Sequence, residues 1–400
     1  MLPEGWRRCT IDDIAKVSSG GTPDRSRDEY WGGDIPWVTT GEIGNGPIDH
    51  TAEKITEIGL RNSAAKIFPA GTLLMAMYGQ GKTRGRIAAL SIKASTNQAC
   101  AAIIAAEDSS ADFLFHNLRS RYEEIRNLSN DGSQKNLSAG LIKALPILLP
   151  PLPEQRKIAE ILSTWDAAIS AQERLIANAK RQKKALMQTL LPTGAHPPKK
   201  RLPGFSEEWR EILLGTAFTE RVERGDDRLP LLSVTQANGV ISQDDAGRRN
   251  ISSDDQSNYK TVRKGDIAYN TMRMWQGASA LSGLTGKVSP AYTVVAPRDG
   301  HDAAFYAYLF KQAAMIHVFE RHSQGLVSDT WNLKFPHFAK IRTCAPGIEE
   351  QQAIARTLKS LDDLAFACER QLTALSREKS ALMQQLLTGK RRVKLEESVA

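Results

Sequence analysis

Apolar side chains recur at alternating intervals of four and three residues in two stretches of the chain. The first series comprises Ile158, Leu162, Trp165, Ile169, Ile176, Ala179, Leu186 and Leu190, with polar Gln172 and Lys183 at two of its steps. The second comprises Ile354, Leu358, Leu361, Ala365, Cys368, Leu372, Leu375, Leu382 and Leu386, with Lys379 where the first has Lys183. A seam of period 3.5 over about four heptads is typical of a coiled coil. We therefore predict long helices within residues 150–191 and 346–389.

The two stretches are copies of one sequence. PPLPEQRKIAEIL, from Pro150, aligns with PGIEEQQAIARTL, from Pro346, at an offset of 196 residues. KALMQTLLPTG and SALMQQLLTG continue the match to the end of each stretch. Weaker matches lie outside the helices, such as Asn136-Leu137 with Asn332-Leu333. We infer a duplicated unit, in which a globular part is followed by a helix.

The globular parts, residues 1–149 and 202–345, mix short strand-like runs with helical runs. Residues 72–77 and 291–295 are typical of strands, and residues 303–319 of a helix. Glycine-rich turns separate these runs, so we predict an α+β domain in each half. A linker rich in proline, residues 192–201, joins the halves, and a charged tail, residues 390–400, ends the chain.

Two copies of one helix in one chain can pair about a pseudo-two-fold axis. We predict an antiparallel coiled coil between the two globular domains; the alternative is that each helix only covers its own domain. About 37 helical residues would span ~55 Å at 1.5 Å each. This exceeds one turn of B-DNA, ~34–36 Å, so such helices could hold two domains over successive major grooves.

Charge and composition narrow the class of partner. The chain has 53 Lys and Arg against 45 Asp and Glu, a net charge of +8, which permits a polyanionic partner without proving one. Its four cysteines form no CxxC pair, no apolar run approaches the ~20 residues of a membrane span, and the N-terminus has no signal-peptide core. We expect a cytoplasmic protein without a membrane partner.

Three motifs carry a family resemblance. SGGTPDRSRDEYWGGDIPWVTTGEI (from Ser19), GTLLMAMYGQGKTRGRIA (from Gly71) and PPLPEQRKIAEIL resemble segments of the specificity subunit of type I restriction–modification enzymes. With the second repeat, the resemblance covers nearly the whole chain. The second globular part lacks a GGTP-like loop and a full YWGGDIPW run, so we expect it to read a different half-site.

The resemblance implies a non-catalytic, sequence-specific DNA-binding subunit with two target-recognition domains. It implies a bipartite, asymmetric target in double-stranded DNA, with one half-site for each domain. The implied partners are two copies of an adenine methyltransferase subunit and, where cleavage occurs, a motor–nuclease subunit. S-adenosylmethionine would be held by the methyltransferase, so no cofactor is expected in this chain.

Polar residues on the glycine-rich loops are candidates for DNA contacts. In the first domain they are Thr22, Arg25, Arg27, Gln80, Lys82, Arg84, Arg86, Gln134, Lys135 and Asn136; in the second, Arg273, Trp275, Gln276, Gln324 and Asn332. Arg, Gln and Asn can make bidentate contacts to base edges, and Lys and Arg can contact phosphates. The competing interpretation is that the basic loop is a solvated turn and that the tryptophans belong to the core.

Other functions have weaker signals. The run GQGKT ends like a phosphate-binding loop, but Ala76 stands where such a loop has its first glycine, and the following residues favour a strand or a turn over a helix. An ATPase that uses Lys82 is therefore an alternative, as is a coiled-coil scaffold that does not read DNA. Histidines at metal-site spacing, a GxSxG elbow, a methyltransferase tetrapeptide and a Rossmann fingerprint are all absent from the sequence.

Overall fold

A computed structural model describes residues 2–44, 46–79, 82–128, 136–224, 228–235, 239–246, 256–327 and 330–395. The chain forms two compact units, residues Met1–Ala171 with Gln371–Ala400 and residues Gln172–Arg370. We call them the first and the second unit. The division falls inside the two long helices, so each unit combines one globular domain with about half of each helix.

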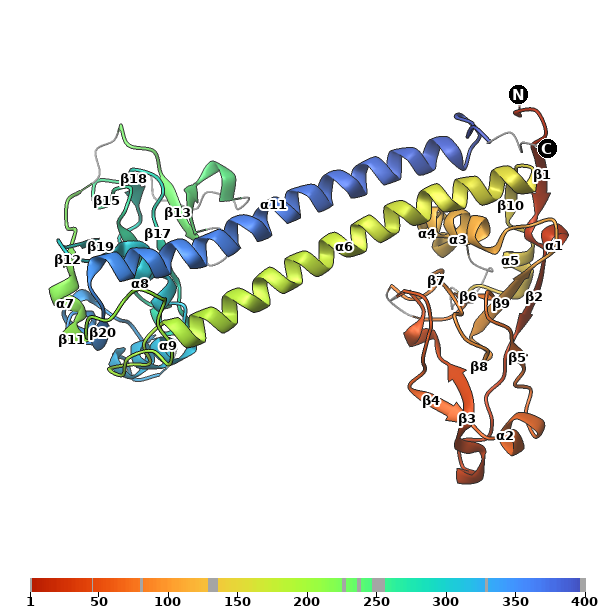
Figure 1. The fold of residues 1–400 in the computed structure, drawn as a ribbon, viewed down its shortest axis with the longest axis horizontal. Helices are drawn as coiled ribbons and strands as arrows, with labels where there is room; N and C mark the ends of the chain where they lie inside the picture. Colours follow the sequence, from red (N-terminus) through yellow and green to blue (C-terminus); the bar gives the residue numbers. More distant parts are fainter. Residues whose placement is uncertain are drawn as a thin grey trace. The chain divides into compact units, whose positions relative to one another are not determined.

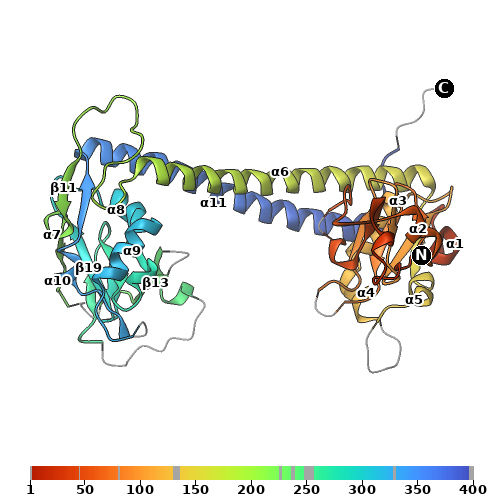
Figure 2. The ribbon, with the colours of Figure 1, turned by 90° about the horizontal axis from the view of Figure 1, so that it is seen from below.

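The predicted helices are α6 (Leu152–Leu190) and α11 (Ile348–Leu386), each of 39 residues. In the first unit the start of α6 packs beside the end of α11, and in the second unit the end of α6 packs beside the start of α11 (Figures 1 and 2). The helices are thus antiparallel within each unit. Every predicted seam residue is buried or half-buried. The predicted fold class is confirmed.

The ends of the seam also contribute to the globular cores. Ile158 and Leu162 of α6 join the first unit's core, and Ile354 and Leu358 of α11 join the second unit's core. The two interpretations of the helices, as partners of each other and as covers of their own domains, therefore both hold. Because each helix buries apolar surface on two sides, helix pairing and domain packing stabilise the same segments.

The first globular domain contains ten strands and several short helices among its described residues. They are β1 (Arg7–Thr10), α1 (Ile11–Ile14), β2 (Ala15–Ser19), η1 (Asp28–Tyr30), β3 (Trp31–Val38), η2 (Thr40–Glu42), β4 (Glu53–Ile55), α2 (Glu57–Arg61), β5 (Ile67–Phe68), β6 (Leu73–Ala76), β7 (Ile87–Ala89), β8 (Ala94–Thr96), β9 (Cys100–Ala105), α3 (Ala111–Ser120), α4 (Tyr122–Asn127), α5 (Ala139–Lys143) and β10 (Pro146–Leu149). The strands form an antiparallel sheet in the order β2-β9-β6-β7, a mixed sheet in the order β4-β3-β8-β5, and the pair β1-β10.

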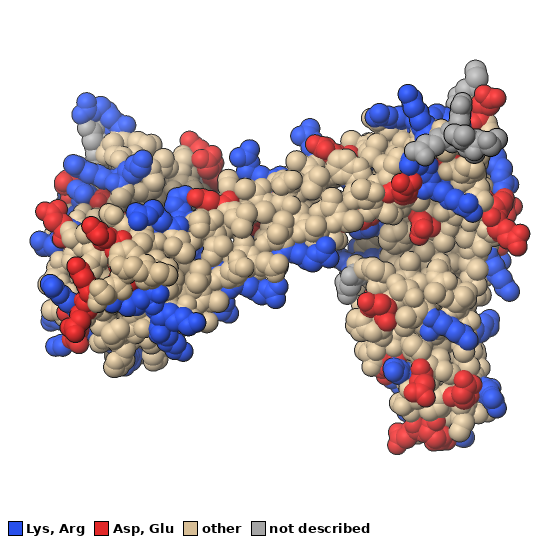
Figure 3. Space-filling view, viewed as in Figure 1, with Lys and Arg blue, Asp and Glu red and all other residues tan. Residues whose placement is uncertain are grey.

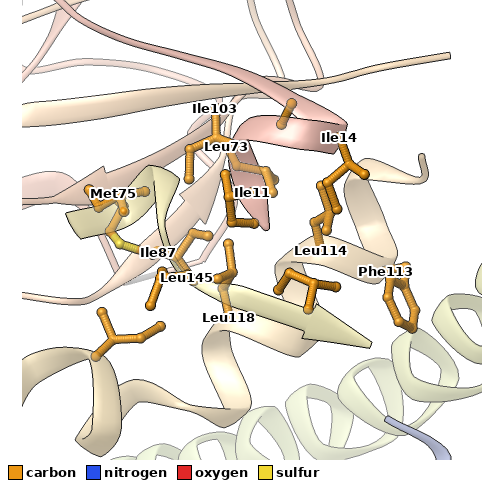
Figure 4. Packing of buried hydrophobic residues seen from close by; sticks show 14 of the residues in the cluster. Ile11, Ile14, Leu73, Met75, Ile87, Ile103, Phe113, Leu114, Leu118 and Leu145 are labelled. Atoms are coloured by element: carbon orange, nitrogen blue, oxygen red, sulfur yellow. The ribbon is translucent and has the colours of Figure 1, made fainter. Parts of the chain in front are cut away.

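One face of the β2-β9-β6-β7 sheet carries the main core of this domain. Leu73 and Ile103 project from the sheet toward Ile11 of α1 and toward Leu114 and Leu118 of α3 (Figure 4). All five side chains are at most 1% exposed. The opposite face packs against the mixed sheet through a second apolar cluster, so the central sheet is buried on both faces.

The second globular domain repeats this topology. Its elements are β11 (Arg210–Leu213), α7 (Leu214–Ala217), β12 (Phe218–Glu220), β13 (Leu232–Thr235), β14 (Gly239–Ser242), η3 (Asp244–Ala246), β15 (Lys260–Val262), β16 (Ile267–Asn270), η4 (Met274–Gln276), β17 (Ser279–Leu281), β18 (Gly286–Val288), β19 (Tyr292–Pro297), α8 (Ala303–Leu309), α9 (Ala313–His322), α10 (Phe335–Phe338) and β20 (Arg342–Ala345). The sheet order β12-β19-β16-β17 and the pair β11-β20 reproduce the sheet and pair of the first domain. The remaining described strands form two pairs, β13-β14 and β15-β18, instead of a four-stranded sheet.

One predicted element is wrong. The sequence favours a single helix over residues 303–319, but the structure interrupts it between α8 and α9. The backbone of Gln312 is extended, and its side-chain amide donates to the Met187 carbonyl of α6. The neighbouring Lys311 ammonium donates to the Gly277 carbonyl at 2.8 Å. Tertiary hydrogen bonds at the break therefore override the local helical pattern.

Candidate nucleic-acid interface

The basic loop between β6 and β7 is a closed turn. The amide of Gly85 donates to the Ala76 carbonyl at 2.8 Å, and the amide of Ala76 donates to the Arg86 carbonyl at 2.9 Å. Strand β7 begins at the next residue, Ile87. The residues that follow Lys82 thus lead into a strand. A phosphate-binding loop requires a helix N-terminus there, so this geometry argues against nucleotide binding.

Helix α4 holds this loop in place. The Tyr122 hydroxyl donates to the Lys82 carbonyl at 2.7 Å and accepts from the Arg126 guanidinium at 2.8 Å. The Lys82 side chain remains exposed, whereas Arg84 and Arg86 are half-buried. The buried Nε of Arg84 has no hydrogen-bond partner among the described residues. The loop therefore presents an exposed lysine and an arginine with an unused donor in this part of the chain.

Three of the predicted loops converge in the first domain. The amide of Met77 donates to the Ala99 carbonyl at 2.8 Å, and the amide of Leu137 donates to the Met77 carbonyl at 3.0 Å. Beside Ala99, the Gln98 side chain accepts a hydrogen bond from the Thr22 hydroxyl. The structure thus brings together the loops that carry Thr22, Lys82 and Asn136. Gln80, Gln134 and Lys135, which were predicted for the same surface, lie outside the described residues.

Close packing explains the two glycines before Thr22. A Cβ on Gly20 would lie 1.8 Å from the carbonyl oxygen of Thr96, and a Cβ on Gly21 would lie 2.4 Å from the backbone of Ala64. The Gly21 carbonyl also accepts a hydrogen bond from the Trp37 indole at 3.0 Å. A larger residue would push the loop away from the sheet, so the glycines fix the position of Thr22.

Arg25 is engaged within the domain. Its guanidinium forms two hydrogen bonds with the Glu53 carboxylate, at 2.5 and 2.9 Å, and lies 4.1 Å from the ring centre of Trp31. The hydrogen bonds from Arg25 lower the pKa of Glu53. Arg25 would have to leave this pair before it could contact a base. Trp37 is 1% exposed and belongs to the core.

The second domain brings the corresponding loops together. The amide of Thr271 donates to the Ala291 carbonyl at 3.1 Å, and the amide of Leu333 donates to the Thr271 carbonyl at 2.8 Å. These two bonds repeat the Met77–Ala99 and Leu137–Met77 bonds of the first domain. The side chains of Arg273 and Gln276 are exposed on this surface.

Trp275, Gln324 and Asn332 support the loops of the second domain. The Trp275 indole donates to the Met272 carbonyl at 3.0 Å, and its ring meets the ring of Trp331 edge-on, with centroids 5.4 Å apart. Gln324 and Asn332 exchange two backbone hydrogen bonds of 2.8 Å, and the Asn332 amide side chain also donates to the Gln324 carbonyl. Trp275 and Asn332 therefore stiffen the loops with their side chains, whereas the side chains of Arg273, Gln276 and Gln324 are exposed.

Sequence reasoning missed two exposed apolar residues at equivalent positions. Tyr78 follows Met77, and Met272 follows Thr271; their exposed fractions are 43% and 48%. Aligning the repeat around β6 and β16 could have paired them, although it would not have shown that both are exposed. Gln98, Tyr122 and Trp331 were missed because their roles depend on long-range contacts.

The other end of the first domain carries charges of both signs. There, acidic and basic side chains lie together on the visible face (Figure 3), where Figure 1 places β3 and β4. These strands adjoin η1, whose Asp28 and Glu29 are exposed, and Arg25 and Arg27 are exposed beside it. Ion pairs of Arg25 with Glu53 and of Arg27 with Glu29 offset these charges within the domain. The described residues contain no group of His, Cys, Asp and Glu suited to hold a metal ion, and none of their helices is long and apolar enough to cross a bilayer.

Comparison with known proteins agrees with this architecture. Residues 3–181 match the family model of the type I restriction modification DNA specificity domain. The specificity subunit of the type I restriction enzyme MjaIX from Methanocaldococcus jannaschii is 30% identical over 195 residues, which cover 48% of this chain and 43% of that protein. The MjaVIII specificity subunit of the same organism is 25% identical over 422 aligned residues, covering 98% and 94%.

A crystal structure shares the fold. The type I restriction-modification S subunit from M. genitalium superposes with a TM-score of 0.62 at 13% identity, covering 98% of this chain and 97% of that one. The duplicated α+β domains and paired long helices therefore define a two-domain specificity-subunit fold. Residues 3–181 thus match the specificity-domain family, and the chain as a whole is similar to type I restriction enzyme specificity subunits in sequence and in fold.

Proposed function

We propose that this chain is a non-catalytic subunit that reads a bipartite, asymmetric target in double-stranded DNA, one half-site with each globular domain. The observation that carries the proposal is the repeated convergence of loops. In the first domain, the loop after β6 forms hydrogen bonds with the turn before β9 and with the Asn-Leu segment at 136–137. In the second domain, the loop after β16 forms the same bonds with the turn before β19 and with the Asn-Leu segment at 332–333. Both domains therefore present one loop surface of common design but different sequence.

The side chains on these surfaces suit DNA. Lys82 and Arg84 in the first domain, and Arg273 in the second, can contact phosphates or guanine edges, and Gln276 can contact adenine. Because the loops differ between the domains, each surface would select its own bases. This expectation agrees with the loss of the GGTP-like loop in the second half of the sequence.

The proposed partners are two adenine methyltransferase subunits and, where cleavage occurs, a motor–nuclease subunit. The support is the similarity to type I specificity subunits together with the outer faces of α6 and α11, where Leu175, Leu364 and Phe366 are 47–62% exposed. S-adenosylmethionine would be bound by the methyltransferase. A cytoplasmic location, where reduced thiols persist, stays an expectation of this proposal.

Genome-wide mapping of methylated adenines tests the function. Cells that express the methyltransferase partner are compared with and without this chain. We expect methylation at one bipartite motif only when the chain is present. Methylation that does not depend on the chain would contradict the proposal, as would a purified complex that binds all DNA sequences equally; the second result would favour a scaffold without sequence reading.

Inserting one heptad in each of the two helices, at paired positions, tests whether they act as a ruler. We expect the gap between the two half-sites to lengthen while the bases within each half-site stay the same. An unchanged gap would show that the helices do not set the spacing.

A further inference from the structure

Both units contain an ion pair between the two long helices at equivalent positions. In the first unit, the Lys379 ammonium of α11 lies 2.6 Å from the Asp166 carboxylate of α6. In the second unit, the Lys183 ammonium of α6 lies 2.6 Å from the Asp362 carboxylate of α11. Asp166 corresponds to Asp362 and Lys183 to Lys379 at the repeat offset of 196 residues.

These pairs are unusual because the lysines occupy positions of the apolar seam. The side chains of Lys379 and Asp166 are 8% and 27% exposed, and those of Lys183 and Asp362 are 26% and 44% exposed. Desolvation lowers the pKa of Lys379, and the carboxylate of Asp166 opposes this change. A lysine at such a position reduces stability unless a carboxylate meets it, so the alignment of the helices matters to each pair.

The charges distinguish antiparallel from parallel pairing. Since α6 and α11 are copies, a parallel in-register pair would place Asp166 opposite Asp362 and Lys183 opposite Lys379. Antiparallel pairing instead places an aspartate opposite a lysine twice. Asp166 and Lys183 are 17 positions apart, as are Asp362 and Lys379, so one antiparallel alignment satisfies both pairs. A slip of one heptad would move both pairs out of contact by ~10 Å.

A third side chain connects each pair to its globular domain. In the first unit, His116 of α3 lies 3.7 Å from the Asp166 carboxylate and contacts the Ser163 hydroxyl of α6 at 3.1 Å. In the second unit, the Tyr308 hydroxyl of α8 donates to the Asp362 carboxylate at 2.9 Å.

His116 and Tyr308 are equivalent residues of the repeat. Each lies six positions after the N-cap of its helix, which is Ser110 in α3 and Asp302 in α8. The same place in each domain therefore contacts the same aspartate.

We propose that the Asp166–Lys379 and Asp362–Lys183 pairs select the antiparallel orientation and the register of α6 and α11, and that His116 and Tyr308 tie each globular domain to that register. The orientation and register of the helices can be measured whether or not the chain binds DNA.

The second unit offers a matched control. Lys180 and Glu369 also pair across the helices, at 2.7 Å, but their side chains are 62% and 47% exposed. In the full-length chain, the test set is Lys183→Asp, Asp362→Lys and the double exchange of the two. The control set is Lys180→Glu, Glu369→Lys and their double exchange. Unfolding by urea gives the coupling within each pair.

We expect either single change at Lys183 or Asp362 to raise the unfolding equilibrium constant at least about tenfold, with recovery in the double exchange. The Lys180 and Glu369 variants should change it by about threefold or less. Equal coupling in the two pairs would overturn the proposal.

Disulfide trapping reports the register directly. The Gln172 amide donates to the Cys368 carbonyl at 3.2 Å, so a Gln172→Cys variant places a thiol beside the native Cys368. A Trp165→Cys variant places the thiol one heptad farther from Cys368 along the same seam. Under copper–phenanthroline oxidation, with products identified by mass spectrometry, we expect the 172–368 link to dominate and the 165–368 link to be absent.

Lys183→Leu keeps the seam apolar and should fold even if the charge reversals do not. We expect this change to reduce the 172–368 link and to produce the 165–368 link. If the cross-links in the Lys183→Leu background match those of the native background, the globular domains alone set the register and the proposal is wrong.

Discussion

Lowering the pH should destabilise the first unit through His116. This imidazole is 1% exposed, and burial is the main cause that lowers its pKa to about 4. The neighbouring Lys379 lowers the pKa further, while Asp166 raises it. The Nδ1 atom of His116 has no hydrogen-bond partner in the described part of the chain, and the Asp166 carboxylate lies 3.7 Å from it. Folding thus requires a neutral imidazole in a site that does not solvate its charged form.

Proton linkage gives the direction and the size of the change in stability with pH. The pKa of the folded state lies below the ordinary value of 6.5, so the stabilising contribution is fully present above pH 6.5 and is lost as the pH falls toward 4. The difference between the two pKa values corresponds to about 3 kcal/mol of stability. Of this, ~2 kcal/mol should be lost between pH 7 and pH 4.5.

The assay is urea unfolding at a series of pH values for the native chain and for His116→Gln. Glutamine cannot titrate, and its amide can still reach the Ser163 hydroxyl. Carboxyl groups titrate in both proteins, so they cancel in the difference. We expect the stability difference between the two proteins to change by ~2 kcal/mol between pH 7 and pH 4.5. Parallel pH profiles for the native chain and His116→Gln would show that His116 does not cause the loss of stability at low pH. The control Tyr308→Phe, at the equivalent place in the second unit, should give a profile parallel to the native one.

Three further predictions concern other contacts. Arg201→Ala should destabilise the chain more than Arg392→Ala in thermal unfolding. Glu154 keeps the indole donor of Trp6 when Arg392 is removed, whereas Arg201 is the only hydrogen-bond partner of the Glu350 carboxylate among the described residues; equal losses in the two variants would contradict this expectation. Lys82→Ala should leave ATP binding undetectable, as in the native chain, and should reduce the salt slope of DNA binding by about one; an unchanged slope would remove Lys82 from the interface. Tyr78→Ala and Met272→Ala should each weaken base selectivity in one half-site, a different one for each variant, by the ~1–3 kcal/mol of a lost base contact. Binding-site selection measures this selectivity, and a loss in both half-sites for either variant would contradict the prediction.

Periodic and repeated features were accessible from the sequence. The seam predicted helices within residues 150–191 and 346–389, and the structure has them at Leu152–Leu190 and Ile348–Leu386. The repeat offset predicted that the two globular domains share one plan, and their central sheets have the same strand order. Both signals are strong because a heptad pattern and a duplication extend over many residues.

Features that depend on distant contacts were not accessible. The break after α8 arises from hydrogen bonds of Lys311 and Gln312 to other elements. Arg25 was a candidate for base contact because it lies in a glycine-rich loop, and only the structure shows its pairing with Glu53. The aspartates that meet Lys183 and Lys379 flank the seam, so the apolar pattern did not single them out.

Exchanging residues 1–149 for the corresponding domain of a type I specificity subunit tests whether each globular domain reads its own half-site. The chimera is expressed with its methyltransferase partner, and methylated adenines are mapped across the genome. We expect one half of the methylated motif to change while the other half and the gap are retained. A change in both halves would contradict it, and so would an unchanged motif.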